Sequence, residues 1–331
     1  MAAANRQILW NESIHFPSAG KRDHQMLRGD ISAGNAQVLT DALEQGDYSS
    51  IRRILQSFLQ ETQEKGAESC LLSNELLVLA LAQPGRLQNL ISIADEAGVA
   101  SCKFLLFLRD PIDQALSLYK HRAKIGTAVD IEVWPEQYYF YGEGLQRFFQ
   151  AVREFPTLLA CRKYENRVGF LEEVFFRDWL KISSSLKPPI KVVNPSLSIS
   201  ELLLIKQLRS MHDQLPEVLY KSFLAIPKEK KAQEPRIEQY YRDVLASHLE
   251  QYRNTWTTCN NYLPPDEQLE LPMATEQSIS STDKVMTFSP VQGQLIARLI
   301  QNATTSSFRW ALRKKQWLNK LSKLKRQMVK S

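Results

Sequence analysis

The residues best suited to chemistry lie in one stretch, residues 104–122, where an apolar run ends at Arg109 and a helical pattern follows. Pro111 suits the first turn of that helix and Asp110 its N-cap. A strand that leads into a helix N-terminus presents unpaired backbone N–H groups at the carboxyl edge of a sheet. Arg109 can add a bidentate pair to a phosphate there, and the Ser117 hydroxyl can add a hydrogen bond. The stretch therefore predicts an anion site.

A purely structural interpretation of the same residues is also open. Arg109 could pair with Asp113 or with another carboxylate at the sheet edge, and Ser117 could simply pack. Local physics does not decide between the two interpretations.

The elements around this stretch alternate between strands and helices. Short apolar runs at 69–73, 103–108 and 157–161 predict buried strands, and weaker strands are predicted at 14–16 and 190–193. Apolar stripes within 51–58 and 145–152 predict helices between them, and Ser198 precedes Glu201 at the spacing of a capping box. We therefore expect an α/β fold with a central parallel sheet flanked by helices, and a helical C-terminal extension.

Composition sets the boundaries and the compartment. The chain has 331 residues, of which 44% are apolar, and no apolar run approaches the roughly 20 residues of a membrane span. The first residues lack the apolar stretch of a secretory signal, so a cytoplasmic location is expected. Cys70, Cys102, Cys161 and Cys259 form no metal-ligand pair, so reduced thiols and no metal site are expected.

Charge and composition divide the chain into three parts. Residues 1–262 carry the α/β pattern, 263–289 have the polar composition of a linker, and 290–331 form a basic amphipathic helical tail. All 36 acidic residues lie at or before Asp283, whereas 11 of the 42 basic residues follow it. The remaining 31 basic residues leave the body at about −5, which argues against a nucleic-acid-coating body.

The chain resembles the sulfotransferase family, in particular bacterial members with a P-loop fold that modify carbohydrates. Arg109-Asp-Pro, with Ser117, Tyr119 and His121 after it, is similar to the 3′-phosphate motif of that family. Three weaker similarities follow in family order: Leu71-Leu-Ser-Asn-Glu75, Tyr164-Glu165 and Asn194-Pro-Ser-Leu-Ser198. Together they span roughly residues 7–270. The resemblance implies the cofactor 3′-phosphoadenosine 5′-phosphosulfate, with Arg109 and Ser117 holding its 3′-phosphate.

One part of the family pattern is missing. Such sulfotransferases begin with a strand and a Gly-rich loop carrying a Lys, which cradles the 5′-phosphosulfate, and this sequence contains no such loop. Ala19-Gly20-Lys21-Arg22 joins flexible backbone to two cations but lacks the spacing of a phosphate loop, so an exposed turn is expected there. A misplaced gene start, a substitute segment and a degenerate relative all fit this absence.

Sulfuryl transfer needs a base for the acceptor hydroxyl, and two residues are candidates. Glu75 follows a predicted strand, but it could instead cap a helix or pair with a basic residue. His24 lies where relatives often carry a His, but it could instead be a surface residue. His15 and His121 are weaker candidates.

The resemblance implies a hydroxyl-bearing acceptor, a saccharide or a glycolipid. Trp134 and residues 138–141 could form a wall on which a sugar stacks, or could pack in the core.

Two other functions compete with catalysis. One is a catalytically inactive, sulfotransferase-like binding protein, which the missing loop favours. The other gives the basic helix at residues 308–331 a role at an anionic membrane surface, peripheral to the inner face, or on nucleic acid. Docking of that helix on the body with its lysines in water is the structural alternative. The sequence does not specify an oligomeric state.

Overall fold

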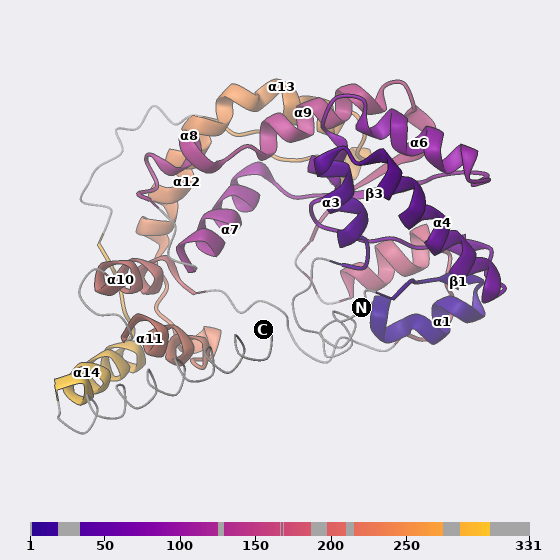
Figure 1. Ribbon diagram of the computed structural model, residues 1–331. Coiled ribbons are helices and arrows are strands. Elements are labelled where there is room, and N and C mark those ends of the chain that lie inside the picture. Colours follow the sequence, from indigo (N-terminus) through magenta and orange to yellow (C-terminus); the bar gives the residue numbers. More distant parts are fainter. Residues whose placement is uncertain are drawn as a thin grey trace, which may run out of the picture. The chain divides into compact units, whose positions relative to one another are not determined.

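The computed structural model describes residues 2–18, 34–124, 129–165, 167, 169–186, 197–209, 215–273 and 285–304. Helices make up most of these residues, and the strands form two separate two-stranded parallel sheets (Figure 1). Parallel strands separated by helices agree with the predicted alternation. The predicted single central sheet is not confirmed, because the described strands pair two by two and helices dominate.

The described strands are β1 (Ile14–His15), β2 (Ser69–Cys70), β3 (Phe104–Leu108) and β4 (Leu159–Lys163). The α-helices are α1 (Arg6–Asn11), α3 (Gln37–Gln45), α4 (Tyr48–Glu64), α5 (Leu77–Leu81), α6 (Arg86–Glu96), α7 (Pro111–Lys124), α8 (Trp134–Tyr138), α9 (Tyr141–Val152), α10 (Ile199–Arg209), α11 (Leu215–Leu224), α12 (Pro235–Leu249), α13 (Arg253–Asn260) and α14 (Pro290–Thr304). Shorter helical turns are η1 (Ala2–Asn5), η3 (Pro156–Leu158), η5 (Lys228–Lys230), η6 (Glu250–Tyr252) and η7 (Pro265–Glu267), and η4 (Glu172–Trp179) is a π-helix.

The chain divides into two compact units, each built from separate segments. Unit 1 comprises Met1–Gln114, Glu136–Asn194 and Ala246–Ala274, and unit 2 comprises Ala115–Pro135, Pro195–Leu245 and Thr275–Ser331. The chain passes from one unit to the other within α7, α8 and α12. This division differs from the predicted boundaries at 262 and 289, since the described part of 263–273 belongs to unit 1 and α14 to unit 2.

Both sheets belong to unit 1. β1 pairs with β2 in the register Ile14 to Ser69, and β3 pairs with β4 from Phe104 and Leu159 to Leu108 and Lys163. The strands predicted at 14–16, 69–73 and 103–108 lie at these places, and the one predicted at 157–161 begins two residues later than expected. The strand predicted at 190–193 lies outside the described residues.

The carboxyl ends of β1 and β2 are held together by Asn35, a buried residue. Its side-chain amide donates to the carbonyl oxygens of Pro17 (3.4 Å) and Leu71 (3.0 Å), and its oxygen accepts from the backbone N–H of Ser73 (2.7 Å). The preceding Gly34 has a φ of +92°, and a Cβ there would lie 2.0 Å from the Ser73 carbonyl oxygen. Only glycine fits this approach.

The helices of unit 1 follow the predicted patterns. The Asp47 side chain accepts a hydrogen bond from Ser50 N at the start of α4; in the predicted stripe Ile51 and Leu55 are buried and Phe58 is half-buried. In α9, the predicted stripe at 145–152 is likewise buried: Leu145, Phe148, Phe149 and Val152. All four cysteines are free; Cys161 and Cys259 are buried, and Cys70 and Cys102 are half-buried.

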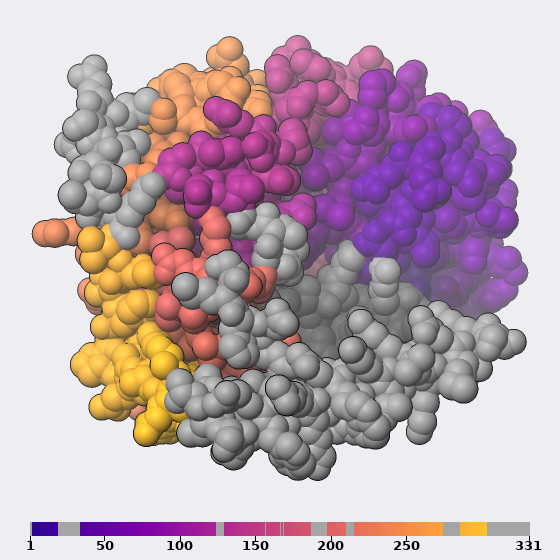
Figure 2. Space-filling model, turned by 60° about the vertical axis from the view of Figure 1, so that its left-hand side comes forward, coloured from indigo at the N-terminus to yellow at the C-terminus, as the bar shows by residue number. Residues whose placement is uncertain are grey.

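In unit 2, helices α10, α11 and α14 pack side by side (Figures 1 and 2). The predicted capping box is confirmed: Glu201 N donates to Ser198 Oγ (3.3 Å), and Ser198 N donates to Glu201 Oε2 (2.9 Å). A second capping box starts α14, where Gln292 N donates to Ser289 Oγ and Ser289 N donates to Gln292 Oε1. The two boxes meet directly, because Gln292 Nε2 donates to Glu201 Oε1 (2.7 Å).

Candidate functional site

The candidate site lies in unit 1, at the carboxyl ends of β3 and β4. β3 ends at the buried Leu108, Arg109 follows with an exposed side chain, and Pro111 begins α7. Gln114 N donates to Asp110 O (2.9 Å), as in a first helical turn. The predicted sequence of strand, arginine and helix start is therefore present.

The Arg109 guanidinium lies over the ring of Tyr164, with its central carbon 4.1 Å from the ring centre. Tyr164 is fixed in place because its backbone N–H donates to Leu108 O (2.6 Å), and because its ring packs edge-on against the buried Phe170. No carboxylate of the described residues lies within ion-pair distance of Arg109, so the predicted alternative, a pair with Asp113, is not formed.

Asp110 lies at the predicted N-cap position of α7, where its backbone carbonyl accepts from Gln114 N, but its side chain has other partners. Its Oδ2 lies 3.1 Å from Lys163 Nζ, and its Oδ1 accepts from the backbone N–H of Glu270 (2.8 Å). Both partners are reached only through the fold: Lys163 is the last residue of β4, and Glu270 belongs to a segment far along the chain. The carboxylate next to Arg109 is therefore already neutralised by a lysine.

Residues 264–270, here called the strap, cover the end of β4. Oε1 of Glu267 lies 2.6 Å from both Nε and Nη2 of Arg162, and its Oε2 accepts from Lys163 N (2.8 Å). Lys163 Nζ also donates to Gln268 O (3.0 Å). The strap thus supplies a charge partner for Arg162 and fixes Lys163, so that Arg109 remains as a cation of this cluster without a carboxylate partner in the described part of the chain.

The other predicted site residues are distributed as follows. Ser117 is exposed on α7, but it falls in unit 2 whereas Arg109 falls in unit 1. Glu75 is exposed in the turn before α5; Asn74 Oδ1, rather than Glu75, accepts the hydrogen bond from Leu76 N (2.7 Å). No hydrogen bond or ion pair links Glu75 to Arg109 in the described ranges. His24 lies outside the described residues.

The remaining candidates also separate. His15 is buried on β1, with Nε2 3.3 Å from Glu61 Oε1, and His121 is exposed on α7. Trp134 and Tyr139 are core residues, whereas Tyr138 and Phe140 are exposed. The aromatic cluster is therefore divided between packing and surface.

The segment that resembles the family's Asn-x-Ser-x-Ser pattern is only partly described. Asn194 and Ser196 lie outside the described residues, as do residues 19–22 and the basic tail at 308–331. Ser198 serves in the capping box of α10, and the carboxylate of Glu234 accepts from the backbone N–H groups of Ile199 and Ser200. This helix N-terminus is therefore occupied by the protein's own carboxylate.

Among the described residues, no group of three or more His, Cys, Asp or Glu side chains is placed to hold a metal ion. Within the same ranges, no helix has the length and apolarity needed to cross a membrane. Comparison of the chain with protein-family models, with curated proteins and with solved structures gives no match.

Sequence reasoning did not identify Lys163, Arg162 and Glu267 as parts of the site. A lysine two residues after a predicted strand and next to Tyr164 is a usable signal for Lys163. No sequence signal indicates Glu267, because it stands in a polar segment whose composition is that of a linker.

Proposed function

We propose that this chain is a sulfotransferase-like protein that transfers a sulfuryl group from 3′-phosphoadenosine 5′-phosphosulfate to a hydroxyl of a saccharide or glycolipid. The observation that carries the proposal is the state of Arg109: it follows β3 at the start of a helix, stacks on Tyr164, and has no carboxylate partner among the described residues. A planar, permanently charged guanidinium held in this way can bind a phosphate with two parallel hydrogen bonds.

The roles of the residues follow from this proposal. Arg109 would hold the 3′-phosphate, with Ser117 as a second donor. Glu75 or His24 would take the proton of the acceptor hydroxyl. The oxygen of that hydroxyl would form a bond to the sulfur, while the bond between the sulfur and the phosphate oxygen of the donor breaks. The exposed position of Glu75 leaves its carboxylate free of internal ion pairs within the described residues.

The proposal extends to the fold. The resemblance implies one central parallel sheet, and β1–β2 and β3–β4 would be its two parts. β3 supports this extension, because its sequence is entirely apolar, as in strands buried on both faces of a parallel sheet, while four of its five residues are only half-buried. An additional strand at the edge of β3 that is unpaired among the described residues would increase its burial.

A second candidate function is a binding protein that recognises an adenosine bisphosphate without transferring sulfate. The specific observation in its favour is that no Gly-rich loop carrying a Lys occurs in the sequence. Preorganised donors at a reacting centre are each worth about 10²- to 10³-fold in rate, so a protein that held the nucleotide through Arg109 without such donors would bind it and transfer sulfate slowly or not at all.

The proposed location is cytoplasmic, with the predicted basic helix at 308–331 attaching the protein to the inner face of a membrane. Deletion of residues 308–331 tests the attachment through retention on liposomes that contain anionic lipid. Unchanged retention after deletion would exclude the membrane role, whereas its loss would support it.

Calorimetric titration of 3′-phosphoadenosine 5′-phosphate tests the cofactor site. Arg109→Ala should weaken binding at least about tenfold, since a charge-assisted hydrogen bond contributes about 1.5 to 3 kcal/mol. Arg53→Ala is the matched control, because Arg53 is exposed on α4 in the same unit and donates to Ser50 Oγ of its own helix. Folded wild type that does not bind would contradict the proposal.

If binding is established, transfer of sulfate from the labelled cofactor to a panel of saccharide and glycolipid acceptors separates the two candidate functions. Product formation that is lost in Glu75→Gln assigns the base to Glu75. Binding without product for any acceptor favours the non-catalytic candidate.

A further inference from the structure

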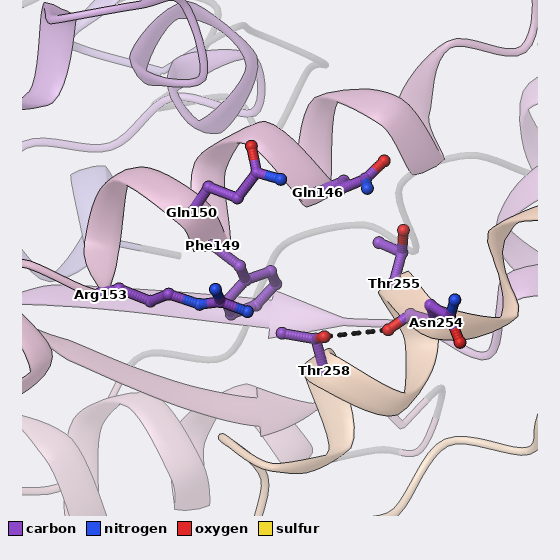
Figure 3. Close-up of a pocket in the computed structure, with 7 residues that line it drawn as sticks. All are labelled: Gln146, Phe149, Gln150, Arg153, Asn254, Thr255 and Thr258. Atoms are coloured by element: carbon purple, nitrogen blue, oxygen red, sulfur yellow. Dashed lines mark hydrogen bonds between the residues drawn. The ribbon is translucent and has the colours of Figure 1, made fainter.

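A second polar site lies in unit 1, in a pocket of about 160 Å³ between α9 and α13. Figure 3 shows the side chains that line it, which come from these two helices: Gln146, Phe149, Gln150, Arg153, Asn254, Thr255 and Thr258. Gln146, Gln150 and Arg153 follow the i, i+4, i+7 spacing of one face of α9 and its C-cap, and Asn254 and Thr258 follow i, i+4 on α13. The helical periods thus bring the polar groups to one place.

The lining residues carry no carboxylate, and Arg153 is their one charged member. Arg153 is exposed, and no described carboxylate lies within ion-pair distance of it. Arg147, also exposed on α9, differs in this respect because it pairs with Glu143. The lining of the pocket therefore carries one positive charge and no negative charge.

The amides of Gln146, Gln150 and Asn254 form no hydrogen bond with other described side chains or backbone groups. Thr255 is 4% exposed and lines the pocket, whereas the Thr258 hydroxyl already donates to Asn254 O (2.9 Å; dashed in Figure 3). Phe149, which also lines the pocket, is buried, and its ring packs against Tyr262 with 4.8 Å between centres.

We propose that this pocket binds a small oxyanion, for which inorganic phosphate is the simplest probe. The ionised oxygens of an oxyanion accept hydrogen bonds, and the pocket offers them a guanidinium, three primary amides and a hydroxyl without a carboxylate among its lining residues. The site is separate in its residues from Arg109, and it does not depend on the proposed sulfotransferase function.

The side-chain amide signals of Gln146, Gln150 and Asn254 in ¹⁵N NMR spectra test the proposal. Titration with inorganic phosphate, at an ionic strength held constant with sodium chloride, should move these signals in a saturable way. Arg153→Gln should weaken the apparent affinity about three- to fivefold, which is the effect expected of an exposed charge pair. Arg147→Gln is the control, since it removes a cation from the same helix without altering the lining, and should leave the affinity unchanged.

Signals that do not move, or that move equally in wild type and Arg153→Gln, would overturn the proposal. A loss of equal size in Arg147→Gln would also overturn it, because a general surface charge effect would then account for the binding. Arg109→Ala should leave these amide shifts intact, so that failure of the cofactor site and failure of this pocket are distinguishable.

Discussion

At the scale of single residues, the ring of Tyr164 determines how Arg109 is presented. The central carbon of the guanidinium lies 4.1 Å from the ring centre, and a cation over an aromatic ring at an exposed site contributes about 0.5 to 1 kcal/mol. Tyr164 acts here through Arg109, so the two residues should not make independent contributions to anion binding.

We expect Tyr164→Leu to weaken binding of 3′-phosphoadenosine 5′-phosphate about three- to fivefold, less than Arg109→Ala, because the charge remains and only its support is lost. The double variant should bind no more weakly than Arg109→Ala. Tyr138→Leu, which removes another exposed tyrosine of unit 1, is the calorimetric control. A further loss in the double variant would show that Tyr164 contacts the ligand itself.

His15 sets a pH dependence of stability at the other sheet. Burial lowers its pKa below the ordinary value, Lys65 and Arg6 lower it further, and Glu61 acts in the opposite direction. Below about pH 6.5 the unfolded chain therefore binds a proton at this residue more readily than the folded one, so the free energy of unfolding falls as the pH decreases.

His15→Gln should make the decrease of unfolding free energy between about pH 7 and pH 5 shallower than in wild type, as measured by urea denaturation. A residual decrease is expected, because burial also lowers the pKa of His248. The exposed His121→Gln serves as the control. Identical slopes for wild type and His15→Gln would contradict the assignment.

At the scale of elements, the strap depends on one carboxylate. Glu267→Gln weakens its contacts with Arg162 and Lys163 and should lower the free energy of unfolding by about 1 to 3 kcal/mol. Glu270→Gln is a matched control, because Glu270 contacts Asp110 through its backbone N–H, which the substitution keeps. A double-mutant cycle with Arg162→Gln measures the coupling; zero coupling would show that the pair adds nothing to stability.

The capping boxes of α10 and α14, which Gln292 and Glu201 join, lead to a second prediction at the scale of elements. Gln292 is fully buried and accepts from Ala232 N and Ser289 N while donating to Glu201. Gln292→Ala removes the acceptor of the Ala232 and Ser289 N–H groups and the donor to Glu201 Oε1, and should lower the free energy of unfolding by about 2 to 3 kcal/mol. Gln294→Ala, exposed on the same helix, should change it little. Equal effects of the two substitutions would mean that the boxes do not hold α14.

The predictable parts of the structure are those encoded by neighbours in sequence. The apolar run of β3, Pro111 at the start of α7 and the Ser198–Glu201 box each depend on residues within a few positions, so pattern and spacing suffice. The partners of Glu201, which are Lys231 and Gln292, are brought to it by tertiary packing, and no local pattern indicates them.

The candidate site divides in the same way. Arg109 and its helix start follow from local sequence, but the pairing of Asp110 with Lys163 requires the β3–β4 register, and the strap requires packing of a segment more than a hundred residues away. The place of Asp110 before α7 follows from the local sequence, whereas its side-chain partners, Lys163 and the backbone N–H of Glu270, do not, because only the fold brings them close.

At the scale of the whole molecule, the two units should respond separately to substitutions. In hydrogen-exchange mass spectrometry, Gln292→Ala should accelerate exchange in α10 and α14 of unit 2 and leave β3 and β4 of unit 1 unchanged. Glu267→Gln should accelerate exchange in β3 and β4 of unit 1 and leave α10 and α14 of unit 2 unchanged. Acceleration throughout the chain by either substitution would show that the molecule unfolds as one cooperative body.

The interleaving of the units along the chain has a consequence for synthesis on the ribosome. Domains usually fold in order as they emerge, but unit 1 requires residues up to the strap, and unit 2 requires Gln292 to complete the contacts of Glu201. Neither unit can close until most of the 331 residues have been made. The nascent chain therefore carries the apolar strand β3 in an unfinished unit for most of translation, and this is the period in which chaperone binding would matter most.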